Sequence, residues 1–598
     1  MTESPSKPEA KPSAPSSDDA TAPAAPQNRW AGVWPWIAIL VVALGIRGAY
    51  LWQIQTIPYF NQPVGDAASY DAWAQEIASG NWVGDQVFYQ APGYPYFLAV
   101  VYTFAGESNR LLAARIVQIT LGALACLFIG LATSRMFARN AGLIAACMLT
   151  VYPPAIFFDG LIQKASVNIA LMSLMVWTLA HISNRPSAFK WLGLGVILSM
   201  LGLTRENTLA LIPVVMVWLW LGFRTTPAPI RGRWFASLCG GILLILFPVA
   251  LRNHHVGGEW LITTSQAGPN FYIGNNPEAT GRYAPLVPGH ETPEFERTDA
   301  VRLAESATGK TLTAKEVSRF WFGRSWEFIR EAPLKWLSLC AQKILLAINR
   351  YEISDVEGYN VYRDFSPILA ILSIVGHFGI LCPIAIAGMV LARSNSKHHK
   401  ILVVLIATFT ISVAAFFVLA RYRAPLVPML IPFTAYALVE FCRRYRERTS
   451  LLAPAVAVII ATAACNWPIN PQQKLDAMAY SNLATMMAQG GNLEGAIEIW
   501  KIGLEVNPNG RELHYNIGLA YELQQKLPEA VKHFSEAKKL DPDLAEVDYH
   551  LGTIFEAVGQ LQKAAWHFTE AQRINPNDSE SIAALARVQA KLNPQQTD

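Results

Sequence analysis

Long apolar runs constrain this chain more than any other feature of its sequence. Roughly eleven of them approach the ~20 residues that a helix needs to cross the hydrocarbon core of a bilayer. Hydrophobic residues make up 52% of the chain, and charged residues only 15%. The pattern predicts an all-α protein built on a polytopic transmembrane bundle. The runs lie near 31–52, 111–134, 141–158, 165–183, 190–204, 206–222, 234–251, 367–392, 401–420, 424–441 and 451–467.

One further apolar run, 92–106, decides the orientation of the bundle. Cytoplasmic loops of membrane proteins carry an excess of Lys and Arg. If 92–106 lies along the membrane surface, the later basic clusters all fall on the side of the N-terminus, and if it spans, they do not. We therefore expect a juxtamembrane helix there, a cytoplasmic N-terminus and a multi-pass protein of the plasma (inner) membrane. The clusters are Arg135/Arg139, Arg185/Lys190, Arg224/Arg231/Arg233, Arg393/Lys397/Lys400 and Arg443/Arg444/Arg446/Arg448.

This topology places the loops 53–110 and 252–364, and everything after 467, outside the cytoplasm. The stretch from Leu51 to Asn109 has acidic residues but no Lys or Arg, which agrees with that placement. Residues 1–28 are rich in Pro, Ala and Ser and predict a disordered cytoplasmic tail. The first apolar run lacks a small-residue cleavage site and is long enough to span, so no cleavable signal is expected.

The C-terminal part repeats itself every 34 residues, as the pairs Asn507-Pro508, Asp541-Pro542 and Asn575-Pro576 show. This period and pattern are similar to tetratricopeptide repeats, in which paired helices bury each other's small and aromatic residues. We expect an α-solenoid over 479–592 that binds a protein partner or acceptor and has no catalysis of its own. Its units would be 479–510, 511–544 and 545–578, with a capping helix after them. The same register holds for Ala496, Ala530 and Ala564, and for Trp500, Phe534 and Phe568.

Asp66 is the first candidate for chemistry. It follows Gly65 and precedes the helical stretch "AASYDAWAQEIAS", so it is well placed to cap that helix. The same position, at the outer mouth of a helical bundle, suits a general base that takes a proton from an attacking hydroxyl. The sequence leaves both roles open, and they are compatible.

Cations at the outer ends of the apolar runs are candidates for binding an anionic group. Ionisable residues at membrane depth are costly and tend to be functional. Arg205, with Glu206, interrupts an apolar stretch, and a functional role and a structural ion pair are equally good interpretations. Outer arginines depart from the positive-inside trend, so a functional role is favoured for Arg421 and Arg423. Lys164 is a further candidate.

Asp159, in "FFDGLIQKAS", is either a second functional acid or, by preference, an interfacial residue at a helix end. Motifs for nucleotide binding or for hydrolases are missing from the sequence, and so are CxxC pairs. The net charge of +4 is too small to indicate the strongly basic surface of a nucleic-acid-binding protein. We expect neither a cofactor nor a nucleic-acid partner.

The order of the motifs resembles a known family. The stretch "GDAASYDAWA", the segment "QAPGYPYFLAVVYTFAG" and the late segment "LARYRAPLVPMLIPF" (419–433) look like landmarks of GT-C glycosyltransferases of the protein O-mannosyltransferase-like or aminoarabinose-transferase-like type. The resemblance covers about 30–450, within an expected membrane domain of 29–470. It implies that Asp66 is the catalytic base and that Tyr70 contributes to substrate binding. Because Ala67 follows Asp66, the acidic metal site of oligosaccharyltransferases is not expected, and we predict no metal.

The resemblance implies an integral-membrane glycosyltransferase. Such an enzyme would move a sugar from a polyprenyl-phosphate donor to a hydroxyl of a protein, lipid or glycan on the extracytoplasmic face. Lys164, Arg205, Arg421 and Arg423 would then bind the donor phosphate. Two alternatives remain open: a polysaccharide ligase or polymerase that uses a polyprenyl-linked donor, and a non-catalytic membrane scaffold that presents the repeats.

Overall fold

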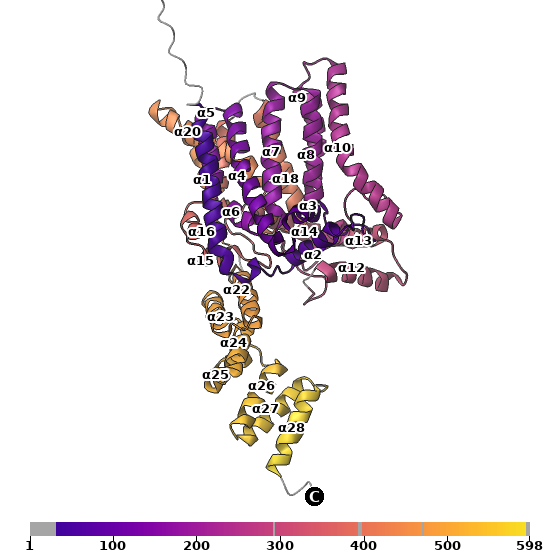
Figure 1. Cartoon of the computed structure of the whole chain (residues 1–598), viewed down its shortest axis with the longest axis vertical. Coiled ribbons are helices and arrows are strands. Elements are labelled where there is room, and N and C mark those ends of the chain that lie inside the picture. Colours follow the sequence, from indigo (N-terminus) through magenta and orange to yellow (C-terminus); the bar gives the residue numbers. More distant parts are fainter. Residues whose placement is uncertain (1–31, 291–292, 393–396, 469–471, 594–598) are drawn as a thin grey trace, which may run out of the picture.

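The computed structural model describes residues 32–290, 293–392, 397–468 and 472–593. The described residues form α-helices and short 3-10 helices, with no strand among them, which confirms the all-α prediction (Figure 1). The tail predicted for 1–28 lies outside the described residues.

Several helices of the bundle have the length and composition of membrane spans. A bent pair adds one more span if its two halves are counted together, with an angle of 50° between them. Pro153 follows the break, and the residue before a proline is pushed to extended backbone, as Tyr152 is with ψ 106°. The five long helices are α1 (Trp34–Gln53), α4 (Arg110–Met136), α7 (Lys164–Asn184), α10 (Ala228–Gly257) and α20 (Leu426–Arg446), and the pair is α5 (Arg139–Thr150) with α6 (Pro153–Gly160).

The remaining expected spans coincide with shorter apolar helices. The expected run 367–392 is divided into α16 (Pro367–Leu372) and α17, which begins six residues later. By length and composition alone, five of the described helices, or six spans with the bent pair, are long enough to cross a bilayer, and the number of eleven spans stays a prediction. The shorter helices are α8 (Ala188–Thr204), η5 (Glu206–Ala210) with α9 (Leu211–Gly222), α17 (Phe378–Leu391), α18 (Lys397–Ala414) and α21 (Leu452–Cys465).

Basic loops gather at one end of the bundle. Arg139 at the start of α5 donates to the carbonyl of Gly32, just before α1, with a distance of 3.2 Å. At the same end, a ring nitrogen of His399 lies 3.3 Å from the carbonyl oxygen of Met136. The start of α1, the α4–α5 turn and the start of α18 are therefore neighbours.

The opposite end carries the loop helices and then the repeats (Figure 1). The run 92–106 forms the separate helix α3 (Gly93–Ala105), which packs against α2 (Asp66–Ala78). The other elements here are η2 (Ile54–Thr56), η3 (Pro58–Phe60), η4 (Glu107–Asn109), α11 (Ala267–Gly274), α12 (Pro293–Thr308), α13 (Ala314–Glu331), α14 (Pro333–Ile348), α15 (Tyr359–Phe365) and α19 (Ala420–Arg423).

The C-terminal helices form pairs in the predicted register. A Cβ atom at Gly518 would lie 2.7 Å from the ring of Phe534, and one at Gly552 would lie 2.7 Å from the ring of Phe568. Glycine at these positions thus lets an aromatic ring of the next helix pack against the backbone. The helices are α22 (Gln472–Gln489), α23 (Leu493–Val506), α24 (Arg511–Leu523), α25 (Leu527–Leu540), α26 (Ala545–Ala557), α27 (Leu561–Ile574) and α28 (Ser579–Leu592).

The first repeat shares a hydrophobic core with the membrane part. One continuous cluster of buried side chains extends from Ile39 in α1 to Ala520 in α24. The later repeats have cores of their own, around Phe534 and around Phe568. The boundary between the core that includes the membrane part and the separate cores of the later repeats therefore lies within the repeat stack, not before it.

Candidate active site

Asp66 is the first residue of α2, and Gly65 occupies the capping position with φ 55°. No side chain makes a capping hydrogen bond at this helix start. The Asp66 carboxylate instead pairs with Arg421 and accepts a hydrogen bond of 3.4 Å from Gln90. The capping role considered from sequence is therefore not the one that the carboxylate plays here.

A cavity of about 130 Å³ lies beside Asp66, at the end of the bundle where the loop helices are. Its lining comes from segments far apart in the sequence: the starts of α2 and α7, the α8–η5 junction, α11, α12, the loop before α15, the end of α18, and α19. Lys164, Arg205 and Arg421 all line it, so the fold brings together three of the four predicted cations.

Arg421 lies between two carboxylates. Its Nη1 atom pairs with Asp66 and also lies 3.0 Å from Oδ2 of Asp355. The arginine side chain is 10% exposed and that of Asp66 is 14% exposed. A buried arginine with two acidic partners fixes both carboxylates at one edge of the cavity.

Arg205 has free hydrogen-bonding capacity at two of its nitrogens. It is 5% exposed, and its Nε and Nη2 atoms have no hydrogen-bond partner among the described residues. Its guanidinium lies over the ring of Tyr422, 4.1 Å from the centroid. Glu206 does not form an ion pair with it, and Oε1 of that carboxylate accepts hydrogen bonds from Thr264 (2.9 Å) and Gln266 (2.7 Å). The predicted alternative of an Arg205–Glu206 ion pair is therefore not seen.

Lys164 and Tyr70 lie next to each other behind Asp66. The Lys164 ammonium is 5.6 Å from the centroid of the Tyr70 ring, and the Tyr70 hydroxyl donates to Oδ2 of Asp66 at 3.5 Å. Tyr70 is fully buried and is not among the residues that line the cavity. Its position supports the carboxylate rather than presenting a surface to a ligand.

Arg423 lies elsewhere. It pairs with Glu352 at 2.6 Å, donates to the carbonyls of Asn349 and Tyr351, and lies over the ring of Phe378. It does not line the cavity. Two residues apart on a helix, Arg421 and Arg423 point in different directions.

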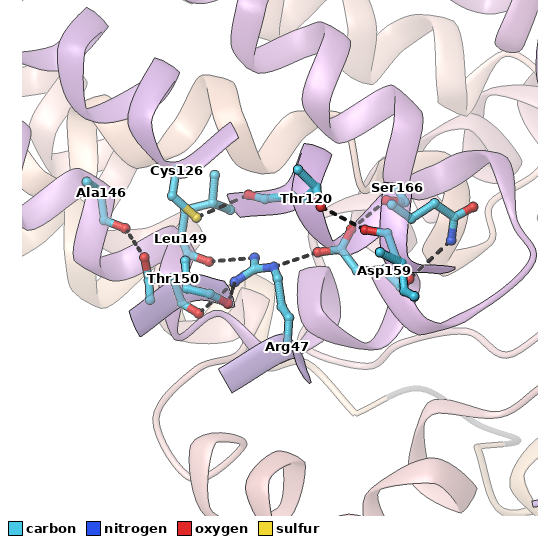
Figure 2. A network of polar contacts seen from close by, with 12 residues as sticks. Arg47, Thr120, Cys126, Ala146, Leu149, Thr150, Asp159 and Ser166 are labelled. Atoms are coloured by element: carbon cyan, nitrogen blue, oxygen red, sulfur yellow. Dashed lines mark hydrogen bonds and ion pairs between the residues drawn. The ribbon is translucent and has the colours of Figure 1, made fainter. Parts of the chain in front are cut away.

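Asp159 also lies away from the cavity, in a buried network inside the bundle (Figure 2). Its Oδ2 accepts a hydrogen bond of 2.7 Å from Nε of Arg47, whose other nitrogens donate to the carbonyls of Leu149 and Thr150. Both side chains are 1% exposed. A Cβ atom at Gly122 would lie 2.1 Å from Asp159, so glycine leaves the room that the ion pair needs. The arrangement is that of a structural ion pair between spans.

The structure adds acids that the sequence analysis did not select. Asp355 and Glu296 both line the cavity. Burial raises the pKa of Glu296 to about 7, and the charge of Asp66 acts in the same direction. Burial and Asp66 likewise hold the pKa of Asp355 above its ordinary value, although Arg421 opposes them. For Asp66, burial is outweighed by the charges of Arg421 and Lys164, which lower its pKa.

These groups can bind an anion and hold a proton acceptor beside it. Among the described residues, no group of three or more His, Cys, Asp or Glu side chains is arranged to hold a metal ion. Arginine and lysine donors in a partly closed site stabilise a phosphate group. The ionised Asp66 carboxylate stands at the edge of the same space.

Two family models match parts of the chain. Residues 89–251 match the model of dolichyl-phosphate-mannose-protein mannosyltransferases, and residues 512–544 match the tetratricopeptide repeat. The predicted resemblance and the predicted repeats are confirmed over these segments. The first segment includes Lys164 and Arg205, whereas Asp66 and Arg421 lie outside it. The chain thus combines a helical membrane part, similar to this class of glycosyltransferase, with a repeat stack.

Solved structures give distant likenesses. The apo oligosaccharyltransferase of Archaeoglobus fulgidus is 13% identical with a TM-score of 0.42, and the match covers 77% of this chain and 58% of that one. ArnT from Cupriavidus metallidurans bound to undecaprenyl phosphate is 14% identical with a TM-score of 0.41, over 86% of this chain and 81% of that one. This chain therefore spans less than two thirds of the oligosaccharyltransferase's length. No curated protein matches this chain.

Proposed function

We propose that this protein is an integral-membrane glycosyltransferase that moves a sugar from a polyprenyl-phosphate donor to a hydroxyl acceptor. One observation carries the proposal: a single cavity at the end of the bundle joins the Asp66 carboxylate to Lys164, Arg205 and Arg421. Burying a charged side chain costs free energy unless the charge is paired or binds a ligand. The match of 89–251 to mannosyltransferases supports the reaction class.

The cations of the cavity supply the phosphate site. Arg205 has unpaired nitrogens, and Lys164 and Arg421 lie around the same space. When the bond between the sugar's anomeric carbon and the phosphate oxygen breaks, its electrons leave with the polyprenyl phosphate, which gains a negative charge. Fixed donors that face this charge lower the barrier of the reaction. Arg423 is not part of this site, and its bonds to Glu352 and Tyr351 suit a structural role.

Asp66 completes the reaction as the general base. The acceptor oxygen attacks the anomeric carbon from the side opposite the phosphate, and its proton passes to Asp66, so the configuration of the sugar inverts. In the ligand-free protein Arg421 pairs with Asp66 and with Asp355. A donor phosphate on Arg421 would weaken the pair with Asp66 and raise the basicity of the carboxylate at the moment when it is needed. Tyr70 supports Asp66 through its hydroxyl.

The site would face the extracytoplasmic side of the inner membrane. The basic loops lie at the end of the bundle opposite the cavity, and positive loops remain in the cytoplasm. The loops 53–110 and 252–364 and the repeats would then be extracytoplasmic, with the N-terminus inside. The repeats would recruit a protein acceptor or a partner, since such stacks present extended binding surfaces.

The test is transfer by the purified full-length protein. A panel of radiolabelled polyprenyl-phosphate sugars is incubated with it and with candidate acceptors, and the products are separated by size. The proposal expects one sugar to be transferred per acceptor hydroxyl from at least one donor. A longer product would favour the polysaccharide ligase or polymerase, and the absence of transfer from every donor would favour the scaffold.

A further inference from the structure

The loop 349–358, between α14 and α15, forms one wall of the cavity. Its Asp355 lies 3.0 Å from Nη1 of Arg421. Its Val356 packs on Gly65, the residue before Asp66, so closely that a Cβ atom there would lie 2.9 Å from the valine methyl. The position of this loop therefore sets the positions of Asp66 and Arg421 relative to each other.

The other side of the loop rests on α22, the first helix of the repeats. The hydroxyl of Tyr351 donates to Oδ1 of Asp476 at 2.9 Å. Both residues are buried, with 5% and 8% of their surfaces exposed. At the end of the loop, a Cβ atom at Gly358 would lie 2.6 Å from that of Ala479. The loop thus lies between the cavity and the repeat stack.

A second connection leads from Tyr351 to the helix that carries Arg421. Nη2 of Arg423 donates to the backbone carbonyl of Tyr351 at 2.8 Å, and the same side chain pairs with Glu352. Arg423 and Arg421 belong to the short helix α19. The side chain of Tyr351 is therefore held by α22 and its backbone by α19.

The hydrophobic packing agrees with these polar contacts. Tyr351 and Ile353 of the loop belong to the same buried cluster as Ala477, Tyr480 and Leu483 of α22. A shared core makes the loop and the helix one mechanical unit, since packed interiors transmit small displacements.

We propose that α22 is a built-in part of the active site and that Asp476 is a positioning residue. It acts through Tyr351 and the loop 349–358 on the Asp355–Arg421–Asp66 group. This inference rests on the proposed function for its kinetic test, but it also makes a structural prediction that needs no activity. The repeats then have two tasks, because the first repeat supports catalysis and the later ones are left for recognition.

The test uses point variants of the full-length protein with a small surrogate acceptor. Asp476→Ala and Tyr351→Phe should each lower kcat about ten- to hundredfold, with a smaller change in KM, because misplaced catalytic groups slow the chemical step. The double variant should be no slower than the worse single variant, since both remove the same contact. In an Asp355→Asn background, Tyr351→Phe should have little further effect.

Matched controls lie in the later repeats. Asp541→Ala removes a carboxylate that pairs with Arg511, and Tyr515→Phe removes a hydroxyl near His550. Both should keep the parent kcat with the surrogate acceptor. Hydrogen–deuterium exchange of 349–358 should be faster in Asp476→Ala and unchanged in Asp541→Ala.

The outcomes separate this inference from the proposed function. If Asp476→Ala lowers only the melting temperature, with parental kcat per folded molecule and parental exchange in 349–358, the inference is overturned. If the parent transfers no sugar, the proposed function fails, and the exchange of 349–358 alone decides the inference, with unchanged exchange contradicting it.

Discussion

Arg421 forms an ion pair with Asp66 although 355 positions separate them in the sequence. The same nitrogen of Arg421 also pairs with Asp355, so one guanidinium connects the start of α2, the loop before α15 and the helix α19. A phosphate that binds Arg421 competes with both carboxylates. In the proposed reaction, this competition would link donor binding to the basicity of Asp66.

Arg421 and Arg423 should respond differently to the same substitution. Arg421→Gln should lower transfer by about two to three orders of magnitude, because it removes a donor that faces the developing phosphate charge. Arg423→Gln should lower the free energy of unfolding by about 3–5 kcal/mol, because it leaves the buried Glu352 without its partner. Its transfer rate per folded molecule should fall less than that of Arg421→Gln, because Arg423 acts only indirectly, through the backbone of Tyr351.

Transfer assays and thermal unfolding in detergent measure the two effects. The pair is its own control, since both variants lose one arginine from the same four-residue helix. If Arg421→Gln transfers sugar at the parent rate, Arg421 does not belong to the phosphate site.

Glu296 should make donor affinity depend on pH. Its pKa is raised to about 7, so it is mostly protonated below that pH and becomes negative above it. The donor phosphodiester keeps one negative charge throughout, so ionised Glu296 repels it. The KM for the donor should rise about fivefold as pH passes from 6 to 8, which corresponds to roughly 1 kcal/mol of repulsion. In Glu296→Gln most of the rise should disappear, and an undiminished rise there would mean that another group causes it.

The ion pair between Arg47 and Asp159 should stabilise the bundle without taking part in transfer. Asp159→Asn should lower the free energy of unfolding by about 3–5 kcal/mol, because it leaves a buried arginine without its charge partner. Combining it with Arg47→Met should cost less than the sum of the single changes. Melting temperatures in detergent give the comparison. Parental stability of both single variants would contradict this role.

The features that the sequence predicts well are those that recur with a period or a fixed spacing. The repeat register is confirmed by the Gly518–Phe534 and Gly552–Phe568 contacts, because each pair recurs at the same interval. The helix at 92–106 is present because its apolar residues continue without a break. The expected number of eleven spans stays a prediction, because several of the apolar runs form helices of 17 residues or fewer.

The site was predicted only in part. Asp66, Lys164, Arg205 and Arg421 meet as expected, whereas Asp355 and Glu296 were missed because charges in a long polar loop carry no periodic signal. The sequence did indicate that the side chains of Arg421 and Arg423 would point in different directions. Residues two apart on a helix do not share a face, so only one of them was able to line the cavity.

Topology reporters test the predicted sides of the membrane. A reporter that is active only in the cytoplasm should work when fused after residue 448 and be silent after residue 598. The prediction rests on the basic end of α20, with Arg443, Arg444 and Arg446, followed by the apolar helix α21. Activity at both positions would mean that α21 does not cross the membrane.

Asp66→Asn tests the central claim most directly. Asparagine keeps an oxygen that accepts hydrogen bonds from Arg421 and Gln90, and Gly65 rather than Asp66 is the capping residue, so the variant should fold and bind donor. It cannot take a proton, so the rate of sugar transfer should fall by roughly two to four orders of magnitude. Transfer within about tenfold of the parent rate, in a variant that folds and binds donor normally, would show that Asp66 is not the base.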